Sequence, residues 1–271
     1  MQMIAEVYGI LRDGMGRSAA ECAAVFEEWN EGPLKSYLIE ISGKVSRAED
    51  AKTAQPVLDI ILDRAGQKGT GRWTVIEAQH LGAPVPVIAA AVSARNISAL
   101  LEVRKEGEGL FGPSPSNLDL APDVVEGALI AGKIMCYAQG FALLDLAGAA
   151  NDWNLPMPEI ARVWREGCII RSAMLNDMAS ALTEAPDHNL MFAPYFAKMV
   201  EENVPHLRHV VTSALSHGLS VPALSAALTY FDMMRTARGT ANMIQAQRDF
   251  FGAHSFERVD AEGAHHGPWG S

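Results

Sequence analysis

A glycine-rich segment in the first third of the chain contains the residue types that bind phosphate or carboxylate groups. Lys68, Gly69, Thr70 and Gly71 supply an ammonium, a hydroxyl and accessible backbone amides, which are the donors that an anion needs. The order of these residues excludes a nucleotide-binding P-loop, in which the lysine directly precedes Ser or Thr and the loop follows a buried strand. Taken alone, the segment is more simply interpreted as a helix–helix connection with a solvated lysine.

Composition limits the class of protein and of partner. The 271 residues can bury a large core, as one helical domain or two fused halves. A net charge of −10 argues against nucleic acid or an anionic membrane as a partner, because both require a basic face. A small anionic ligand needs only a few cations in one cleft. No apolar run appears long enough to span a bilayer uninterrupted, and the first residues do not resemble a signal peptide, so we expect a cytoplasmic protein.

The cysteines give no indication of a metal site or a disulfide. Cys22, Cys136 and Cys168 lie far apart among apolar neighbours and lack metal-ligand spacing. Reduced, buried thiols and no metal are therefore expected.

Helical patterns dominate the chain and predict an all-α fold. Ser18 and Glu21 have the spacing of a capping box, and prolines suit the first turns of several helices. Strand-like alternation is absent almost everywhere. Gly127, Gly132 and Gly140 should let helices approach closely. The longer predicted helices cover residues 86–101, 122–151, 158–165, 169–182, 192–216 and 222–250.

Two boundaries divide the predicted helices. Residues 105–117, rich in glycine, proline and serine, form an expected irregular boundary. The helical patterns on its two sides are loosely alike, so a pseudo-repeat is suspected, although residue identity does not demonstrate one. We expect a helical domain at residues 1–250 and an irregular tail at 251–271, whose Phe256 and Trp269 should pack against other residues.

The segment from Ile61 to Trp73 resembles, position by position, the signature of 6-phosphogluconate dehydrogenases. Five further segments resemble the same family in the same order, and together they cover essentially the whole chain. They are Trp29-Asn30 with the run from Ser36 to Ile41, the run from Ala91 to Arg95, the run from Lys133 to Phe141, the run from Trp164 to Ser172, and the run from Ile244 to His254.

The resemblance implies a sugar-phosphate site shared by two subunits. By this resemblance Lys68, Thr70 and Arg95 contact the phosphate of 6-phosphogluconate, while Arg248 and His254 reach the site from the partner's tail. A homodimer with exchanged tails follows. An arginine fork binds phosphate bidentately and a lysine adds charge, so the residue types agree with these roles.

Each candidate also has an ordinary interpretation when it is considered alone. Arg95 would be a snorkelling or ion-paired helix residue, Arg248 a solvated charge at a helix end, and His254 a hydrogen-bonded tail residue. Three tryptophans are expected to be core residues and not to bind ligand: Trp29, Trp73 and Trp164. Arg171 is expected to be structural, and His265 and His266 to be ordinary tail residues, because two adjacent histidines seldom share one site.

The resemblance also implies chemistry that this chain is not expected to supply. The family oxidises the 3-hydroxyl of 6-phosphogluconate with NADP and decarboxylates the product to ribulose 5-phosphate, a step of the pentose phosphate pathway. Its NADP lies on an N-terminal Rossmann domain, and its catalytic lysine and glutamate come shortly before a Met-Gln pair that resembles Met1-Gln2. The sequence shows no strand–turn–helix followed by an acidic residue. We therefore expect no catalytic residue, no secure NADP binding and no turnover by this chain alone.

One alternative remains open. The chain could be a non-catalytic helical module that dimerises or binds sugar phosphate. Another hydroxyacid dehydrogenase is disfavoured, because the Lys-Gly-Thr-Gly loop and the Arg/His tail go with the phosphogluconate branch.

Overall fold

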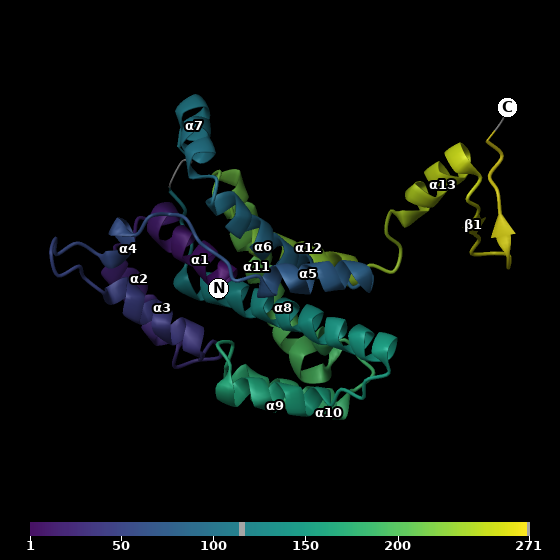
Figure 1. The fold of residues 1–271 in the computed structure, drawn as a ribbon, viewed down its shortest axis with the longest axis horizontal. Helices are drawn as coiled ribbons and strands as arrows, with labels where there is room; N and C mark the ends of the chain where they lie inside the picture. Colours follow the sequence, from purple (N-terminus) through teal and green to yellow (C-terminus); the bar gives the residue numbers. More distant parts are fainter. Residues whose placement is uncertain (114–116, 270–271) are drawn as a thin grey trace. The chain divides into compact units, whose positions relative to one another are not determined.

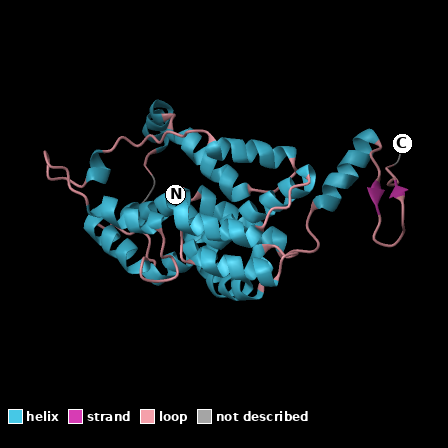
Figure 2. Ribbon diagram, turned by 60° about the horizontal axis from the view of Figure 1, so that its bottom comes forward, coloured by secondary structure: helices cyan, strands magenta, loops and turns pink. Residues whose placement is uncertain are grey.

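The computed structural model describes residues 1–113 and 117–269 and confirms the all-α prediction. Within these ranges the only strands are β1 (Phe256–Glu257) and β2 (Ala264–His265), which pair antiparallel near the C-terminus (Figure 2). The chain forms two compact units, Met1–Tyr230 and Phe231–Ser271. The division therefore falls after residue 230 and not after residue 250, and the predicted irregular tail contains a short hairpin.

The helices of the first unit begin as their sequences indicate. Ser18 and Glu21 form the expected capping box, and prolines occupy the first turn of several helices. The second unit contains α13 (Ala241–Gly252). The earlier helices are α1 (Gln2–Gly9) with a π-helical turn (Ile10–Gly14), α2 (Ala19–Trp29), α3 (Tyr37–Arg47), α4 (Val57–Ile60), α5 (Thr70–His80), α6 (Pro86–Ser98), α7 (Leu101–Phe111), α8 (Pro122–Asn151), α9 (Met157–Gly167), α10 (Met174–Glu184), a 3-10 turn (Leu190–Phe192), α11 (Pro194–Ser216) and α12 (Pro222–Met234).

Several helix boundaries differ from the prediction, and the helix expected over 169–182 begins only at Met174. The helix expected over 86–101 ends at Ser98, and α7 leaves at an angle of 85°. The guanidinium of Arg104 donates to the Ser98 carbonyl at this bend. Residues expected to be irregular from 105 onward remain helical to Phe111, and 114–116 lie outside the described residues. The helix expected over 222–250 is broken between α12 and α13, where Gly239 stands.

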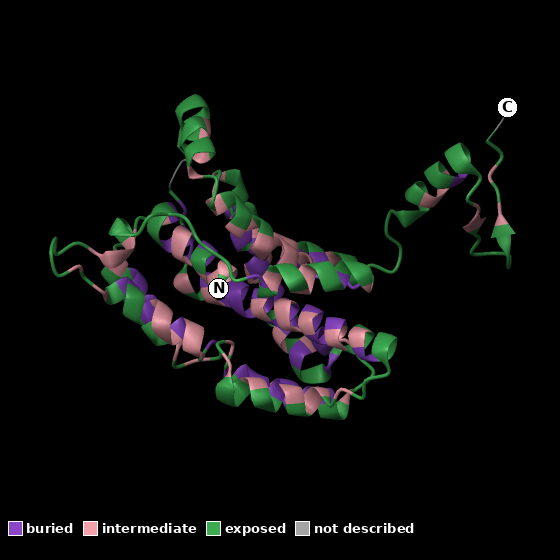
Figure 3. Ribbon diagram, in the orientation of Figure 1, coloured by how far each residue is buried: buried purple, intermediate pink, exposed green. Residues whose placement is uncertain are grey.

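Helix α8 is the central helix of the first unit and packs along α11 (Figures 1 and 3). Gly127 permits this packing, because a Cβ there would lie 2.2 Å from Nδ1 of His206. A Cβ at Gly132 would lie 2.8 Å from Sδ of Met3, whereas Gly140 has nothing within 4 Å, so close approach is confirmed at two of the three glycines. Contrary to the sequence-based expectation, α8 is long and apolar enough to cross a membrane, but 67% of its apolar window is buried inside the protein, as in a core helix.

A symmetric pair of backbone hydrogen bonds joins the two halves of the first unit. Tyr37 N donates to Arg171 O at 3.1 Å, and Ala173 N donates to Lys35 O at 3.0 Å. Lys35 and Arg171 are separated in sequence by the same number of residues as Tyr37 and Ala173. Ser36 and Ser172 form the β-bridge between these bonds. The two halves are therefore joined here by a short antiparallel backbone contact.

The two halves also exchange buried helix caps. Glu6 of α1 accepts hydrogen bonds from Ala223 N (2.8 Å) and Leu224 N (2.9 Å) at the start of α12. Gln139 of α8 accepts a hydrogen bond from Val87 N (3.0 Å) at the start of α6. Both capped helices begin with Val-Pro. Burial raises the pKa of Glu6, and the bonds from the two amides oppose that shift.

The packing at Gly127 yields a stability prediction with a control on the same helix. Gly127→Ala should lower the free energy of unfolding by about 1–3 kcal/mol, because the new methyl group overlaps the His206 ring. Gly140→Ala should cause no loss, since space is open there and alanine favours helix by up to about 1 kcal/mol. Denaturant unfolding measures both variants. Equal effects of the two substitutions would show that α8 and α11 do not touch at Gly127.

Candidate functional site

The Lys-Gly-Thr-Gly segment forms the start of α5. Gly69 is the N-cap residue at φ 107°, a conformation that residues with a side chain rarely adopt. A Cβ at Gly69 would also lie 3.3 Å from the Trp73 ring. No side chain caps this helix, so the amides at its start are left for water or a ligand. Lys68 and Thr70 are exposed on either side of Gly69.

Hydrogen bonds tie the loop before α5 to α6. Ala65 N donates to Oγ of Ser98 at 3.1 Å, and that hydroxyl donates to the carbonyl of Arg95 at 2.7 Å. Helices α5 and α6 also approach closely, since a Cβ at Gly71 would lie 3.1 Å from Cγ2 of Val92. Lys68 and Thr70 therefore lie in a segment that is hydrogen-bonded to α6, the helix that carries Arg95. The predicted loop is held in place by these contacts with α6.

The two cations of this region are not neutralised by carboxylates. Neither Lys68 nor Arg95 forms an ion pair with a residue in the described part of the chain. The positive end of the α5 dipole adds to their charge. Free amides, a hydroxyl and two available cations suit an anion with several oxygens, such as a phosphate.

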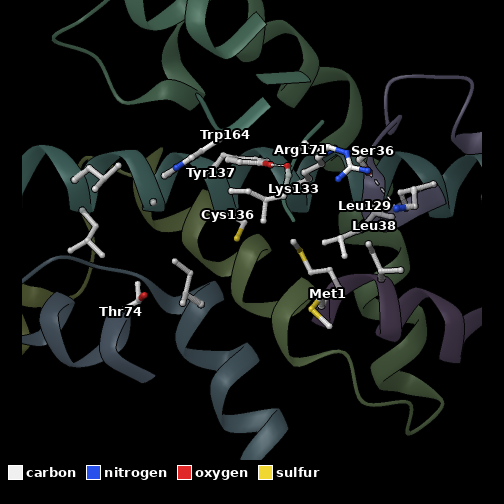
Figure 4. A pocket seen from close by; sticks show the side chains of 18 of the residues that line it. Met1, Ser36, Leu38, Thr74, Leu129, Lys133, Cys136, Tyr137, Trp164 and Arg171 are labelled. Carbon is white, nitrogen blue, oxygen red and sulfur yellow. Dashed lines mark hydrogen bonds between the residues drawn. The ribbon is translucent and has the colours of Figure 1, made fainter. Parts of the chain in front are cut away.

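A cavity of about 570 Å³ lies beside α5 and is bounded by α1, α3, α8 and α9 (Figure 4). Most of its lining is apolar, and none of the five predicted site residues lines it. Trp73 and Trp164 do line it; Trp73 is 60% exposed, so its expected core position is wrong. Trp29 is buried, as predicted.

Lys133 also lines this cavity, although it was not among the candidate residues predicted from the sequence. Its Nζ donates to Oγ of Ser172 at 2.7 Å, and no carboxylate among the described residues pairs with it. Burial lowers the pKa of Lys133 to about 8. The sequence does contain a signal for Lys133, because it is the lone cation in the apolar sequence of α8. Arg171 lines the same cavity and lies over the Tyr37 ring at 3.9 Å, in agreement with a structural role.

Arg248 and His254 belong to the second unit, and their part in the phosphate site stays a prediction. Arg248 lies on α13 and donates to Oε1 of Gln245 at 2.8 Å. His254 follows that helix, with its ring 5.8 Å from the Phe251 ring. His266 contacts a carboxylate and His265 a backbone carbonyl, so these two histidines do not share a site.

The described residues do not fit a dinucleotide cofactor. Gly107, Gly109 and Gly112 have the Gly-x-Gly-x-x-Gly spacing, but they lie at the end of α7 and not between a strand and a helix. No sheet of the Rossmann kind exists in the described ranges, and no metal-binding cluster is found there. No residue in the described ranges is therefore assigned to hydride transfer. The three cysteines are free thiols, as predicted, although only Cys22 is fully buried.

Known proteins match the chain over almost its full length. A family model described as 6-phosphogluconate dehydrogenase, C-terminal domain, matches residues 1–269. Two similar proteins of Bacillus subtilis are the NAD-dependent (45% identity) and the NADP-dependent (46% identity) decarboxylating 6-phosphogluconate dehydrogenases, each matched over 99% of this chain. The 6-phosphogluconate dehydrogenase of Plasmodium falciparum, which has been described apo, with NADP⁺ and with 6-phosphogluconate, superposes with a TM-score of 0.95 at 38% identity over 99% of this chain.

The match has the same extent in each relative. The chain spans 59% of the length of the two Bacillus proteins and of the Plasmodium chain. The order of the quoted motifs, the helical fold and the family match agree with one another. The chain belongs to the family of 6-phosphogluconate dehydrogenase C-terminal domains.

Proposed function

We propose that this chain is the substrate-binding and dimerising part of an enzyme that converts 6-phosphogluconate to ribulose 5-phosphate with NADP in the cytoplasm. The observation that carries the proposal is the uncapped, glycine-started helix α5, whose loop is hydrogen-bonded to the helix of the unpaired Arg95. The family membership and the names of the relatives support the same substrate. The two Bacillus proteins are named for different dinucleotides at nearly equal identity to this chain, so this similarity does not distinguish NADP from NAD.

Within this proposal Lys68, Thr70 and Arg95 bind the phosphate of the substrate. The start of α5 offers amides directed at an anion, Thr70 adds a hydroxyl, and the two cations neutralise the phosphate charge. The phosphate lies away from the reacting hydroxyl, so these residues contribute binding and orientation. No residue of this chain is assigned to proton transfer.

The proposal includes a second copy of the chain, whose Arg248 and His254 complete the site. Support comes from exposed apolar side chains on α13: Met243, Ile244, Phe250 and Phe251 are 57–74% exposed. Side chains of this kind are commonly covered by a partner. A tail inserted against a second subunit would bury them and bring Arg248 toward the partner's phosphate site.

A polypeptide of these 271 residues should not turn over substrate. It should give no sustained reduction of NADP with 6-phosphogluconate, because it positions neither a proton-transfer group nor a nicotinamide. Absorbance of the reduced dinucleotide measures the reaction, and the NADP-dependent Bacillus enzyme serves as the positive control. Steady turnover by the purified polypeptide would show that the catalytic groups lie within it.

Binding of 6-phosphogluconate to the same polypeptide should depend on Lys68 and Arg248. Lys68→Ala and Arg248→Ala each remove a charge-assisted contact, which should cost roughly 1.5–3 kcal/mol of binding free energy by calorimetry. Lys52→Ala and Arg258→Ala remove exposed cations elsewhere and should leave affinity unchanged. If both site variants bind like wild type, these residues do not belong to the site.

Mixed dimers test the proposed tail exchange. Chains carrying Lys68→Ala and chains carrying Arg248→Ala are combined, so that each heterodimer holds one copy of each. Because the two residues come from different subunits in the proposal, one site per heterodimer regains both and should bind with wild-type affinity. Uniformly weak binding would place Lys68 and Arg248 of the same subunit together.

The backbone at Gly69 should matter as much as the charge beside it. Gly69→Ala places a side chain at φ 107° against the Trp73 ring, a strain of about 1–3 kcal/mol that shifts the loop and weakens binding. Gly66→Ala is the matched control, because a Cβ there meets nothing within 4 Å. Calorimetry compares the variants. Equal affinities would show that the conformation of the loop does not determine binding.

A further inference from the structure

We propose that Asp249 is a positioning residue that fixes Arg248 and His254 in the geometry required to grip the phosphate. The inference rests on the proposed function, since it takes these two residues as ligands of the substrate. It adds a residue that would not touch the substrate and would act through its immediate neighbours. All of the groups involved lie in the second unit.

Asp249 accepts four hydrogen bonds from the tail that follows it. Its Oδ1 accepts from Ser255 N at 2.8 Å and from Nδ1 of His266 at 2.6 Å. Its Oδ2 accepts from Gly267 N at 2.9 Å and from Nε1 of Trp269 at 2.6 Å. Four donors fill the acceptor capacity of a carboxylate. The carboxylate therefore joins the end of α13 to both sides of the hairpin.

The environment of Asp249 favours its ionised form. Only 3% of the residue is exposed, and desolvation acts to raise its pKa. The hydrogen bonds from Gly267, Trp269, His266 and Ser255 outweigh this effect and hold the pKa of Asp249 well below its usual range. A neutral amide of the same shape cannot reproduce the arrangement, because its NH₂ group would face two of the donors.

The bond to Ser255 N closes the turn that contains His254. Ala253 (φ 49°) and Ser255 (φ 60°) are both left-handed, a conformation that costs free energy in residues other than glycine and persists only where neighbours impose it. A Cβ at Gly252 would lie 2.6 Å from Nε2 of His254, so the turn brings this ring back against the end of α13. Asp249 thus determines the direction of His254. Asp249 also follows Arg248 directly in α13, so the contacts that hold Asp249 in place also hold the backbone of Arg248.

The arrangement does not require a second subunit. Trp269, held by Asp249, has its ring 6.2 Å from that of Phe250 and 6.4 Å from that of Phe256, so apolar contacts reinforce the hydrogen bonds. A tail that is ordered before it meets its partner loses less conformational freedom on binding. The phosphate would then bind to Arg248 and His254 in positions that are fixed before binding.

The first test measures 6-phosphogluconate affinity of the full 271-residue chain by calorimetry. Asp249→Asn should weaken binding about tenfold, as expected for the loss of one well-placed charge-assisted contact. Asp260→Asn, which removes an exposed carboxylate of the same hairpin paired with Arg258, should bind like wild type. Wild-type affinity for Asp249→Asn would overturn the proposal.

A second pair of variants separates positioning from loss of folding. His266→Ala removes one donor to Asp249 and should weaken binding several-fold while the helical circular dichroism is retained. His266→Gln keeps an N–H donor and should restore most of the affinity. If Asp249→Asn unfolds α13, this pair carries the test, and equal affinities of His266→Ala and His266→Gln would overturn the proposal.

A combined background shows whether Asp249 acts through its neighbours. In a chain that already carries Arg248→Ala and His254→Ala, Asp249→Asn should weaken binding no further; additional weakening would mean that it acts elsewhere. If Arg248→Ala and His254→Ala each leave affinity unchanged, the proposed phosphate site is wrong, and the positioning role falls with it. If they weaken binding while Asp249→Asn does not, only the positioning role is wrong.

Discussion

The first amides of a helix have no partner within the helix, and the way each is satisfied organises this protein. At the starts of α12 and α6, buried side chains from another helix accept them: Glu6 in one case and Gln139 in the other. At the start of α5 no side chain does so, and the amides remain available to an anion. Other helices, among them α8, α11 and α13, also start without a side-chain cap, and what distinguishes the open start of α5 is that Lys68 and Thr70 lie beside it.

The difference between the two halves follows the same principle. Gly82 (φ 64°) and Gly218 (φ 73°) end α5 and α11, and each stands four residues before the proline of a Val-Pro helix start, so these two helix ends correspond. In the second half α11 continues unbroken through Pro205 and packs along α8. In the first half the corresponding stretch is divided into α4, a loop and α5. Because of this break, the first half lacks a long helix packed as α11 is on α8. The same break produces α5, the helix that starts after Gly69.

Much of this could be read from the sequence because the signals are local. A capping box, prolines in first turns and the absence of alternation predicted an all-α fold, and residues 61–73 indicated the loop that is proposed here to bind an anion. The break after Ser98 was not predicted; Arg104 bonds there both to the Ser98 carbonyl and to Asp63, a residue far away in the sequence. Lys133 and the exposed side of Trp73 were missed, since the cavity they line is formed by helices far apart in sequence. An internal repeat could not be demonstrated from residue identity. Glu6 and Gln139 both accept hydrogen bonds from the first amides of a helix, but they are different residue types.

The exchange of caps between halves bears on whether either half could exist alone. A polypeptide of the first half would leave the amides of α6 without an acceptor, and one of the second half would leave those of α12 bare. Unpaired buried amides are costly, so a solitary half would gain from meeting another with a carboxyl or amide side chain in the matching place. Each half therefore supplies the acceptor that the other half needs, and separating the two would leave unpaired donors in both.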